Sequence, residues 1–351
     1  LQGLDLSETT LSGSDLRGAN LSGSDLRHAD LRGILYDKHT QWPDGFDPVD
    51  KDIYFLGVKG RLQGINLKEE DLSNLNLREA NLQEVLLQDV HLSGSQLQDA
   101  NLREGQLIRV QMSDVSLKRA RLNGVKLHNV NLTKSDLTGA HLNGASLHGT
   151  SLMDSNLQEA DLSSSILKDA SLRNVNLSGA NLQGVHFLTV NLRGADLSGT
   201  DLRGVDLSGA FYDEQTEWPE DFEPAGKGLY FLGEATKLHE VSLVAADLTQ
   251  SNLRSANIKG VNLTQAYMAE AEMVGTTIVE SNLQAAKLKG ADLRRTIISD
   301  TSLREADLRG VNLKGASLNK VDLSRSDLRG ASLVGVDLHQ VKLKGAVYDQ
   351  H

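Results

Sequence analysis

The sequence predicts an all-β fold, a four-sided β-solenoid, from three features of one short repeat. A large apolar residue, usually Leu, recurs at every fifth position, as at Leu137, Leu142 and Leu147. A small residue, usually Ala, Ser, Thr or Val, lies two positions before it. The residue between these two is often Asp or Asn, so the repeated word reads A-(D/N)-L-x-x.

The five-residue period excludes both common regular elements. On an α-helix, five residues turn the chain by about 140°, which would spread the Leu side chains around the whole cylinder. On a flat strand, an odd period would place successive Leu side chains on opposite faces. The chain must therefore turn a corner after each repeat. Four sides close a coil of about twenty residues, and coils stack at about 4.8 Å with Leu pointing to the axis.

The repeat divides the chain into solenoid segments and insertions. We expect solenoid at residues 1–36, 62–212 and 238–351, and inserted loops at residues 37–61 and 213–237. The three solenoid segments are expected to form one continuous stack of about fifteen coils. Each coil buries four large side chains, and burying each one contributes about 1.5–3 kcal/mol before the cost of chain entropy.

One copy of the repeat is Ala195–Asp196–Leu197–Ser198–Gly199. With dozens of such copies in register, the sequence resembles those of the pentapeptide-repeat family. The resemblance covers nearly all of the chain. It implies a right-handed quadrilateral β-helix, and the handedness comes from the resemblance rather than from the spacing. Some members of the family act on topoisomerases as mimics of DNA, which makes that activity one hypothesis for this chain.

The two insertions resemble each other. The first runs from Tyr36 to Gly57 and the second from Tyr212 to Gly233, and both read Y-D-x-x-T-x-W-P-x-x-F-x-P followed by Y-F-L-G. Both Trp and all four Pro of the chain lie in them. Cyanobacterial pentapeptide-repeat proteins carry similar loops, which indicates origin rather than activity. The Tyr-Phe-Leu-Gly segment predicts a strand that rebuilds one wall of the solenoid.

The same pattern starts a third time at Tyr348 and Asp349. We therefore interpret the chain as a fragment of a longer repeat protein. Counting repeats from Tyr36 to Tyr212 and from Tyr212 to Tyr348 predicts that all three insertions leave from one wall of the solenoid. Insertions aligned in this way would suit regularly spaced contacts with a long partner.

Composition excludes several classes of function. The chain has no Cys, so it offers no disulfide, thiolate metal site or Cys nucleophile. Its formal net charge of -11 argues against nucleic acid as an electrostatic partner. No apolar run is long enough to span a membrane, and no targeting signal is visible, so the cytoplasm is favoured with the compartment left open. No catalytic, cofactor-binding or metal-binding motif stands out from the repeat, and we expect a protein that is not an enzyme.

The insertions hold the first candidate partner contacts. Aromatic side chains often anchor interfaces, but the favoured interpretation is that these fold back over the solenoid wall. The second insertion is strongly acidic, although its spacing matches no calcium loop. The candidate residues are Trp42, Phe46, Trp218, Phe222, Glu217, Glu220, Asp221 and Glu223.

One outer wall of the middle segment holds the second set. It carries the core residues from Leu87 to Phe187, and its outward positions include four large apolar residues: Leu86, Ile108, Ile166 and Leu188. The alternatives are a docking strip, a chance grouping, or residues covered by a loop. His128 and His148 should stack on the same wall, and a solvated pair is favoured over a metal site because further ligands are missing.

Three non-enzymatic functions follow. The first is a structural scaffold that presents a long rigid surface to an unidentified protein partner. The second is self-assembly by end-to-end stacking of exposed coils. The third is a DNA mimic that modulates a type II topoisomerase, which the clustered basic residues between Arg294 and Lys344 disfavour.

Overall fold

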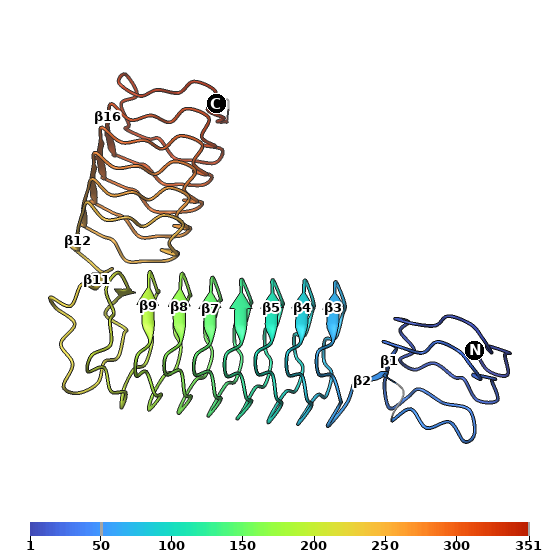
Figure 1. Cartoon of the computed structure of the whole chain (residues 1–351). Helices are drawn as coiled ribbons and strands as arrows, with labels where there is room; N and C mark the ends of the chain where they lie inside the picture. Colours follow the sequence, from blue (N-terminus) through green and yellow to red (C-terminus); the bar gives the residue numbers. More distant parts are fainter. Residues whose placement is uncertain (50–51, 350–351) are drawn as a thin grey trace. The chain divides into compact units, whose positions relative to one another are not determined.

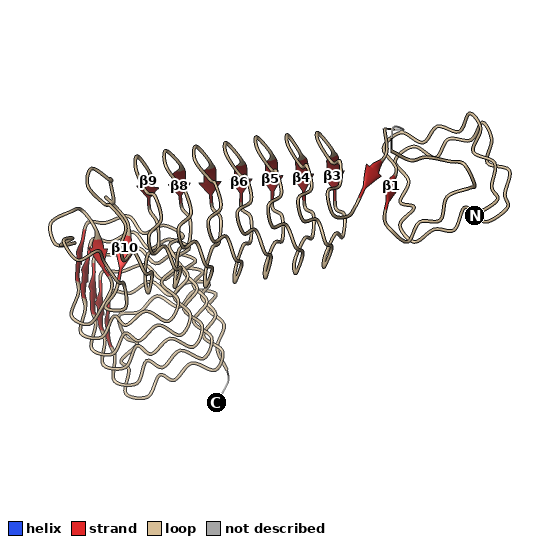
Figure 2. Cartoon of the chain, turned by 90° about the horizontal axis from the view of Figure 1, so that it is seen from below, coloured by secondary structure: helices blue, strands red, loops and turns tan. Residues whose placement is uncertain are grey.

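The computed structural model describes residues 1–49 and 52–349 and contains strands and turns, with no helix among these residues (Figures 1 and 2). The described chain forms about 14 turns of parallel β-solenoid, which confirms the predicted fold class. It divides into two compact units. The first comprises Leu1–Val190, Ala195–Leu207 and Glu217–Glu223, and the second comprises Asn191–Gly194, Ser208–Thr216 and the residues from Pro224 onward. The continuity of one solenoid across both insertions stays a prediction.

The first unit contains a seven-stranded parallel sheet along one wall of its coils. Neighbouring strands pair at a spacing of twenty residues, as in Leu107 with Leu127. The three other walls of each coil pair through single bridges at the same spacing, which gives the four sides that the sequence predicts. The strands are β3 (Asn66–Lys68), β4 (Leu86–Gln88), β5 (Gln106–Ile108), β6 (Lys126–His128), β7 (Ser146–His148), β8 (Ile166–Lys168) and β9 (His186–Leu188).

The second unit repeats this arrangement with a five-stranded parallel sheet. Its strands are β12 (Lys237–His239), β13 (Asn257–Lys259), β14 (Thr277–Val279), β15 (Ile297–Ser299) and β16 (Ser317–Asn319). Among the described residues, no helix is long and apolar enough to cross a membrane.

Nearly every corner is a tight turn with one residue in the left-handed region. At the corner after Leu77, the Ala80 N–H donates to the Leu77 carbonyl at 3.1 Å, and Glu79 has a φ of 57°. A positive φ at this position is typical of a type II turn. Gly occupies it at Gly139, with a φ of 63°, because Gly adopts this conformation without steric cost. Gly therefore suits the fifth position of the repeat, although residues of many other kinds also adopt the positive φ there.

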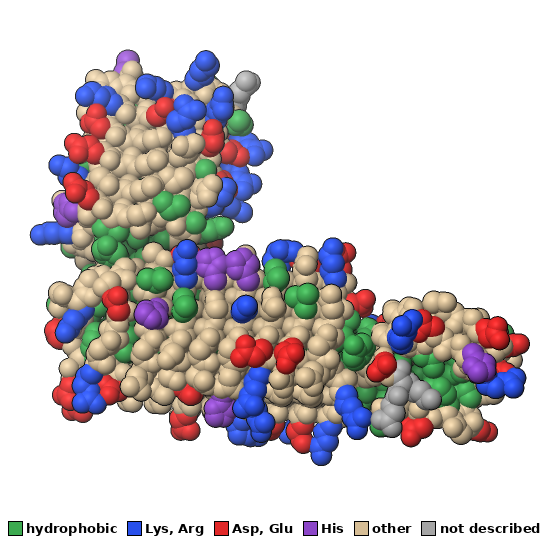
Figure 3. All heavy atoms as spheres, in the orientation of Figure 1, with side chains coloured by type: hydrophobic (Ala, Val, Ile, Leu, Met, Phe, Trp, Pro, Cys, Tyr) green, Lys and Arg blue, Asp and Glu red, His purple; other side chains and the backbone are tan. Residues whose placement is uncertain are grey.

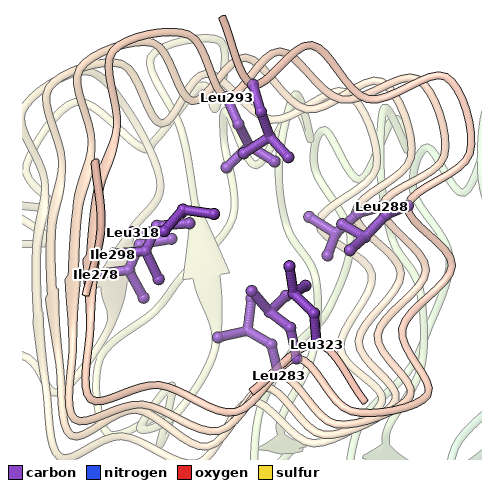
Figure 4. Close-up of a pocket in the computed structure, with 10 residues that line it drawn as sticks. Ile278, Leu283, Leu288, Leu293, Ile298, Leu318 and Leu323 are labelled. Carbon is purple, nitrogen blue, oxygen red and sulfur yellow. The ribbon is translucent and has the colours of Figure 1, made fainter. Parts of the chain in front are cut away.

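Buried apolar side chains fill the axis of each stack. In the second unit, Ile278, Ile298 and Leu318 lie above one another on one wall, and Leu288 and Leu293 face them from two others (Figure 4). All five are less than a tenth exposed. Where the small inward position is Ser or Thr, its hydroxyl usually donates to a backbone carbonyl, which satisfies this buried polar group. Ser155 Oγ, for example, lies 2.7 Å from the Leu132 carbonyl oxygen. The buried Ser165 hydroxyl has no hydrogen-bond partner among the described residues.

Each insertion returns to the solenoid through a short strand. β2 (Tyr54–Phe55) pairs with β1 (Leu35–Tyr36), and β11 (Tyr230–Phe231) pairs with β10 (Phe211–Tyr212), both in parallel. This confirms the strand predicted for the Tyr-Phe-Leu-Gly segments. Among the described residues, no bridge joins residues 1–55 to residues 61 and beyond. The ladder therefore restarts after the insertion, and the alignment of all three insertions on one wall stays a prediction.

The start of each insertion is held by one repeated contact. The Asp37 carboxylate accepts a hydrogen bond from the Gly18 N–H at 2.9 Å, and Asp213 accepts one from Gly194 at 2.9 Å. At the third start of the pattern, Asp349 accepts one from Gly330 at 2.6 Å. The third copy thus begins with the same geometry, while Gln350 and His351 lie outside the described residues.

An Arg beside this contact joins the coil before an insertion to the coil after it. Arg17 Nη1 donates to the Asp71 carbonyl at 2.9 Å, across the first insertion. Arg193 occupies the equivalent position at the second insertion, and its Nη2 donates to the Thr249 carbonyl at 2.9 Å. Beside it, Asn191 Nδ2 donates to the Asp247 carbonyl at 3.0 Å. These Arg residues bridge a gap that the interrupted ladder leaves.

Ion pairs between the Asp and the Arg of the sequence D-L-R lie on the outer walls of the solenoid. Arg32 donates from Nε and Nη2 to the two carboxylate oxygens of Asp30, at 2.9 and 2.8 Å. Hydrogen bonding from this guanidinium lowers the pKa of Asp30 to about 2. Arg203 and Arg329 lower the pKa of Asp201 and Asp327 to about 2 in the same way.

These carboxyl groups predict a modest loss of stability in acid. Their folded-state pKa lies below the usual value of about 3.9, so their contribution is complete above about pH 4 and is lost as the pH falls toward 2. The effect should be small because the pairs are exposed to solvent. Urea midpoints measured from pH 5 to pH 2 should fall for the wild type and fall less for a D30N/D201N/D327N variant. Parallel profiles for the two proteins would contradict this prediction.

Candidate interaction surface

The outward side chains of β3–β9 form a face with basic and apolar groups and no acid. The seven strand sequences contain no Asp or Glu. We call this surface the basic face, and its cationic and imidazole side chains are Lys68, Lys126, His128, His148, Lys168 and His186. Blue and purple side chains gather over the middle strands in Figure 3.

Two lysines of this face lack a neutralising partner. Lys126 and Lys168 are exposed, and neither makes an ion pair with another described residue. The acids nearest to the face lie at the corners, where Asp89 pairs with Arg109 at 2.7 Å, Glu69 pairs with Lys68 at 3.2 Å, and the Asp169 carboxylate lies 3.8 Å from His148 Nδ1. Lys126 and Lys168 therefore keep uncompensated positive charge on a protein whose formal net charge is -11.

The four predicted apolar residues lie on this face in two pairs instead of one strip. Leu86 on β4 and Ile108 on β5 are half-buried. Ile166 on β8 and Leu188 on β9 are 45% and 46% exposed. Between the pairs lie β6 and β7, whose outward side chains are polar or basic. The pairs are about three strand spacings apart, or about 14 Å.

The centre of the face is hollowed. A shallow hollow of about 290 Å³ is lined by Ile108, Lys126, His128, Gln106 and Ser146, with Leu127 beneath. The rings of His128 and His148 stack at its edge, with centroids 4.8 Å apart and planes inclined by 30°. Among the described residues, no three His, Asp or Glu side chains are grouped to hold a metal ion. The hollow therefore combines an apolar side, an ammonium group and imidazole rings, a combination suited to a carboxylate carried on an apolar stem.

The aromatic side chains of the insertions are half-buried and stack on each other. Trp42 stacks on Phe46 with centroids 4.8 Å apart and contacts Tyr36 edge-on at 5.4 Å. Both pack against the first hydrophobic cluster, which includes Leu16 and Ile34. In the second insertion, the rings of Trp218 and Phe222 lie 4.9 Å apart. This packing accords with the covering role, and contact with a partner stays a prediction.

The four acidic candidates of the second insertion are exposed. Glu217, Glu220, Asp221 and Glu223 lie within the segment Glu217–Glu223, which we call the acidic segment. Its first residue continues a wall of the first unit, since the Glu217 N–H donates to the Ala195 carbonyl at 2.9 Å and the Leu197 N–H donates to the Glu217 carbonyl at 2.7 Å. The acidic segment therefore starts from a fixed backbone position.

The acidic segment and the basic face lie on opposite walls of the same stack. The bridge from Asp196 to Glu217 ends a ladder that runs from Asn76 to Asp196 in steps of twenty residues and takes a final step of twenty-one. That wall begins ten residues after β3 in each coil, which is two of the four sides away. The structure thus separates the most acidic and the most basic surfaces of the first unit by the full width of the coil.

Sequence reasoning found the wall and its apolar residues but missed its charge. Lys126, Lys168 and His186 were readable in the sequence, at the positions immediately before or after the buried apolar residue of one wall. The sequence feature that indicates the basic face is the absence of Asp and Glu immediately before and after the buried apolar residue of this wall in seven successive coils. Only a charge count made wall by wall, rather than along the chain, could have shown it.

The repeats match the family described as pentapeptide repeats over residues 1–33, 61–94, 95–134, 131–169, 170–209, 235–268, 246–284, 278–315 and 306–345. The chain belongs to this family. The pentapeptide-repeat segments match the solenoid described above, and the two gaps in the match coincide with the insertions. No significant match was found among curated proteins.

Several solved structures of pentapeptide-repeat proteins resemble this chain. HetL, involved in heterocyst differentiation regulation in the cyanobacterium Nostoc sp. strain PCC 7120, is 24% identical over 82% of this chain and 92% of its own, with a TM-score of 0.16. Rfr23 from the cyanobacterium Cyanothece 51142 is 29% identical over 45% of this chain and 87% of its own, with a TM-score of 0.19. QnrB1, a plasmid-mediated fluoroquinolone resistance protein, is 17% identical over 70% of this chain and 91% of its own, with a TM-score of 0.24.

Proposed function

We propose that this pentapeptide-repeat protein is a non-catalytic scaffold that binds a protein partner through the basic face of β3–β9. The observation that carries the proposal is the combination of unpaired Lys126 and Lys168 with the exposed Ile166 and Leu188 on one wall. Exposed apolar groups rimmed by polar ones mark interaction sites more often than scattered apolar residues do.

The backbone supports this function because the face is already ordered before binding. Each strand of β3–β9 pairs with its neighbours in register, as Lys126 does with Gln106 and Ser146. The side chains of the face therefore project from a fixed lattice, and binding costs little ordering of the scaffold. An extended partner segment lying along the stack would meet a repeated set of contacts.

Affinity capture with three forms of the full chain tests the scaffold. The face variant is K126E/K168E, and the matched control is R121E/K134E, which also reverses two basic charges but places them off the basic face, on either side of β6. We expect a partner that the wild type and the control retain and the face variant loses, since reversed charge repels an acidic surface. Equal capture by all three proteins would contradict binding through this face.

A DNA mimic acting on a topoisomerase is the alternative, and the charge distribution disfavours it. Between Arg294 and Lys344 the chain has ten basic and six acidic residues, whereas a mimic of phosphate rows would stay negative along its length. The basic face interrupts the negative charge in the first unit as well.

We therefore expect the full chain to leave DNA gyrase unaffected. In a supercoiling assay with equimolar or ten-fold excess chain, the rate should match that of the enzyme alone. Protection from a fluoroquinolone should also be absent. Stoichiometric inhibition, relieved by neutralising the exposed acids, would replace the scaffold proposal by mimicry.

A further inference from the structure

We propose that the basic face of one copy binds the acidic segment Glu217–Glu223 of a second copy, an inference that rests on the proposed scaffold function. The two surfaces are complementary in charge, since the face has no acid on its seven strands and the segment has no base. Complementary potentials steer association and fix register.

The acidic segment has the shape as well as the charge of a ligand for this face. The Phe222 N–H donates to the Pro219 carbonyl at 3.0 Å, and the Trp218 and Phe222 rings lie 4.9 Å apart, so the segment is held as a compact turn. Its four acidic residues are exposed. A carboxylate could reach Lys126 in the hollow while the neighbouring apolar atoms meet Ile108.

Docking within one chain is prevented by the fold. Glu217 is bridged to Asp196 on the wall opposite β3–β9, and both surfaces belong to the first unit. The segment would have to cross the outside of the coil to reach its own face. Its complementary surface is therefore on another molecule.

The geometry of opposite walls makes this contact heterologous. Each copy presents a segment on one side and a face on the other, so neither surface is used up when the other binds. Contacts of this kind continue from copy to copy unless the rotation closes a ring. We infer lateral association of solenoids side by side, which is different from stacking at the ends of the coils.

The chain supplies its own matched control for the segment. The first insertion has the same pattern of Trp, Pro and Phe, but it carries Lys38 and His39 and has only three acids, Asp37, Asp44 and Asp47, between Tyr36 and Pro48. The second insertion has six acids and no Lys or Arg between Tyr212 and Pro224. If charge determines binding, only the second insertion should bind the basic face.

Peptide binding to the full chain tests the contact directly. Labelled peptides of residues 212–224 and 36–48 are titrated by fluorescence anisotropy with wild type, K126E/K168E and R121E/K134E. We expect the acidic peptide to bind the wild type and the control alike, and to bind the face variant about ten-fold more weakly or worse. Raising salt from about 50 mM to 0.5 M should weaken binding because the charges are exposed. Equal binding of both peptides, or indifference to the face variant, would overturn the proposal.

Sedimentation velocity of the full chain tests association between copies. The wild type should associate as its concentration rises, whereas K126E/K168E and E220K/E223K should each stay monomeric. Mixing these two variants should restore association, because the reversed segment of one meets the reversed face of the other. A misfolded variant could not be rescued by mixing, so this arm separates loss of contact from loss of fold.

The remaining outcomes are decisive. Association that persists in both variants is end-to-end stacking and overturns lateral docking. A wild type that stays monomeric at high micromolar concentration also overturns it, even if the peptide binds. In that case, loss of a heterologous partner by the face variant in affinity capture would leave the scaffold function standing. Failure of both experiments would remove the scaffold function as well.

Discussion

Replacing Leu137 by Asp should lower the free energy of unfolding of the first unit by several kcal/mol. Leu137 is fully buried at the axis of the stack, and an unpaired carboxylate there loses its hydration without gaining a partner. Effects above about 4 kcal/mol are reserved for changes of this kind. Thermal unfolding followed by circular dichroism should show a transition many degrees below that of the wild type, and amide exchange should accelerate in the coils on either side.

The control is the same substitution on the outside of the same stack. Ile166 is 45% exposed on β8, so I166D should unfold close to the wild type. Because coils contact mainly their neighbours, the L137D effect should spread along the stack rather than stay at one residue. A midpoint for L137D within a degree or two of the wild type would refute the assignment of this position to the core.

Replacing Arg193 by Ala should produce the second large effect, a loss of about 1–3 kcal/mol at the second insertion. Arg193 is 3% exposed, and its guanidinium donates to the Thr249 carbonyl. Removing it takes this donor from the carbonyl of the half-buried Thr249 and leaves a cavity where the buried side chain was. Hydrogen exchange should accelerate in the coil that contains Thr249 before the rest of the second unit opens.

Two equivalent arginines provide a graded control for this prediction. The Arg17 side chain is 23% exposed and the Arg329 side chain is 57% exposed. Each of the three arginines follows a buried Leu, but Arg17 and Arg329 pair with an Asp two residues earlier, whereas Asn191 occupies that position before Arg193. The loss of stability on substitution by Ala should therefore decrease from Arg193 to Arg17 to Arg329. An equal loss at all three positions would show that the bridge across the insertion does not set the effect.

The sequence predicted the coil because one requirement recurs at every fifth residue. A position such as Leu127 must be apolar in each coil, so its neighbours at 107 and 147 repeat the same constraint, and dozens of weak signals add up. The strands that end each insertion were also predictable, since Tyr54–Phe55 has the composition of a strand. The interruption of the ladder was not predictable, because nothing in the repeat indicates whether the Tyr54 strand pairs with the coil that follows the insertion.

The interaction surface was only half predictable for a related reason. Outward positions such as Lys126 are not constrained by packing, so their residue types do not repeat every five residues. Their pattern appears only when residues of the same wall, twenty positions apart, are compared. The bridges made by Arg17 and Arg193 were invisible at the sequence level, because each side chain reaches a carbonyl about fifty-five residues away along the chain. Every residue type has a backbone carbonyl, so a hydrogen bond from a distant Arg to a carbonyl imposes no amino-acid preference on the residue that accepts it.

The contact between Asp and Gly at the start of each insertion has a consequence for how such chains can evolve. The Asp213 contact lies at the end of the solenoid block whose sheet has seven strands, and the Asp349 contact lies at the end of the block whose sheet has five strands. Gain or loss of twenty residues adds or removes one coil and leaves this contact in place, whereas five, ten or fifteen residues would shift it to another wall. Unequal recombination between repeats should therefore be tolerated only in steps of whole coils, and natural length variants should differ between insertions by multiples of twenty residues.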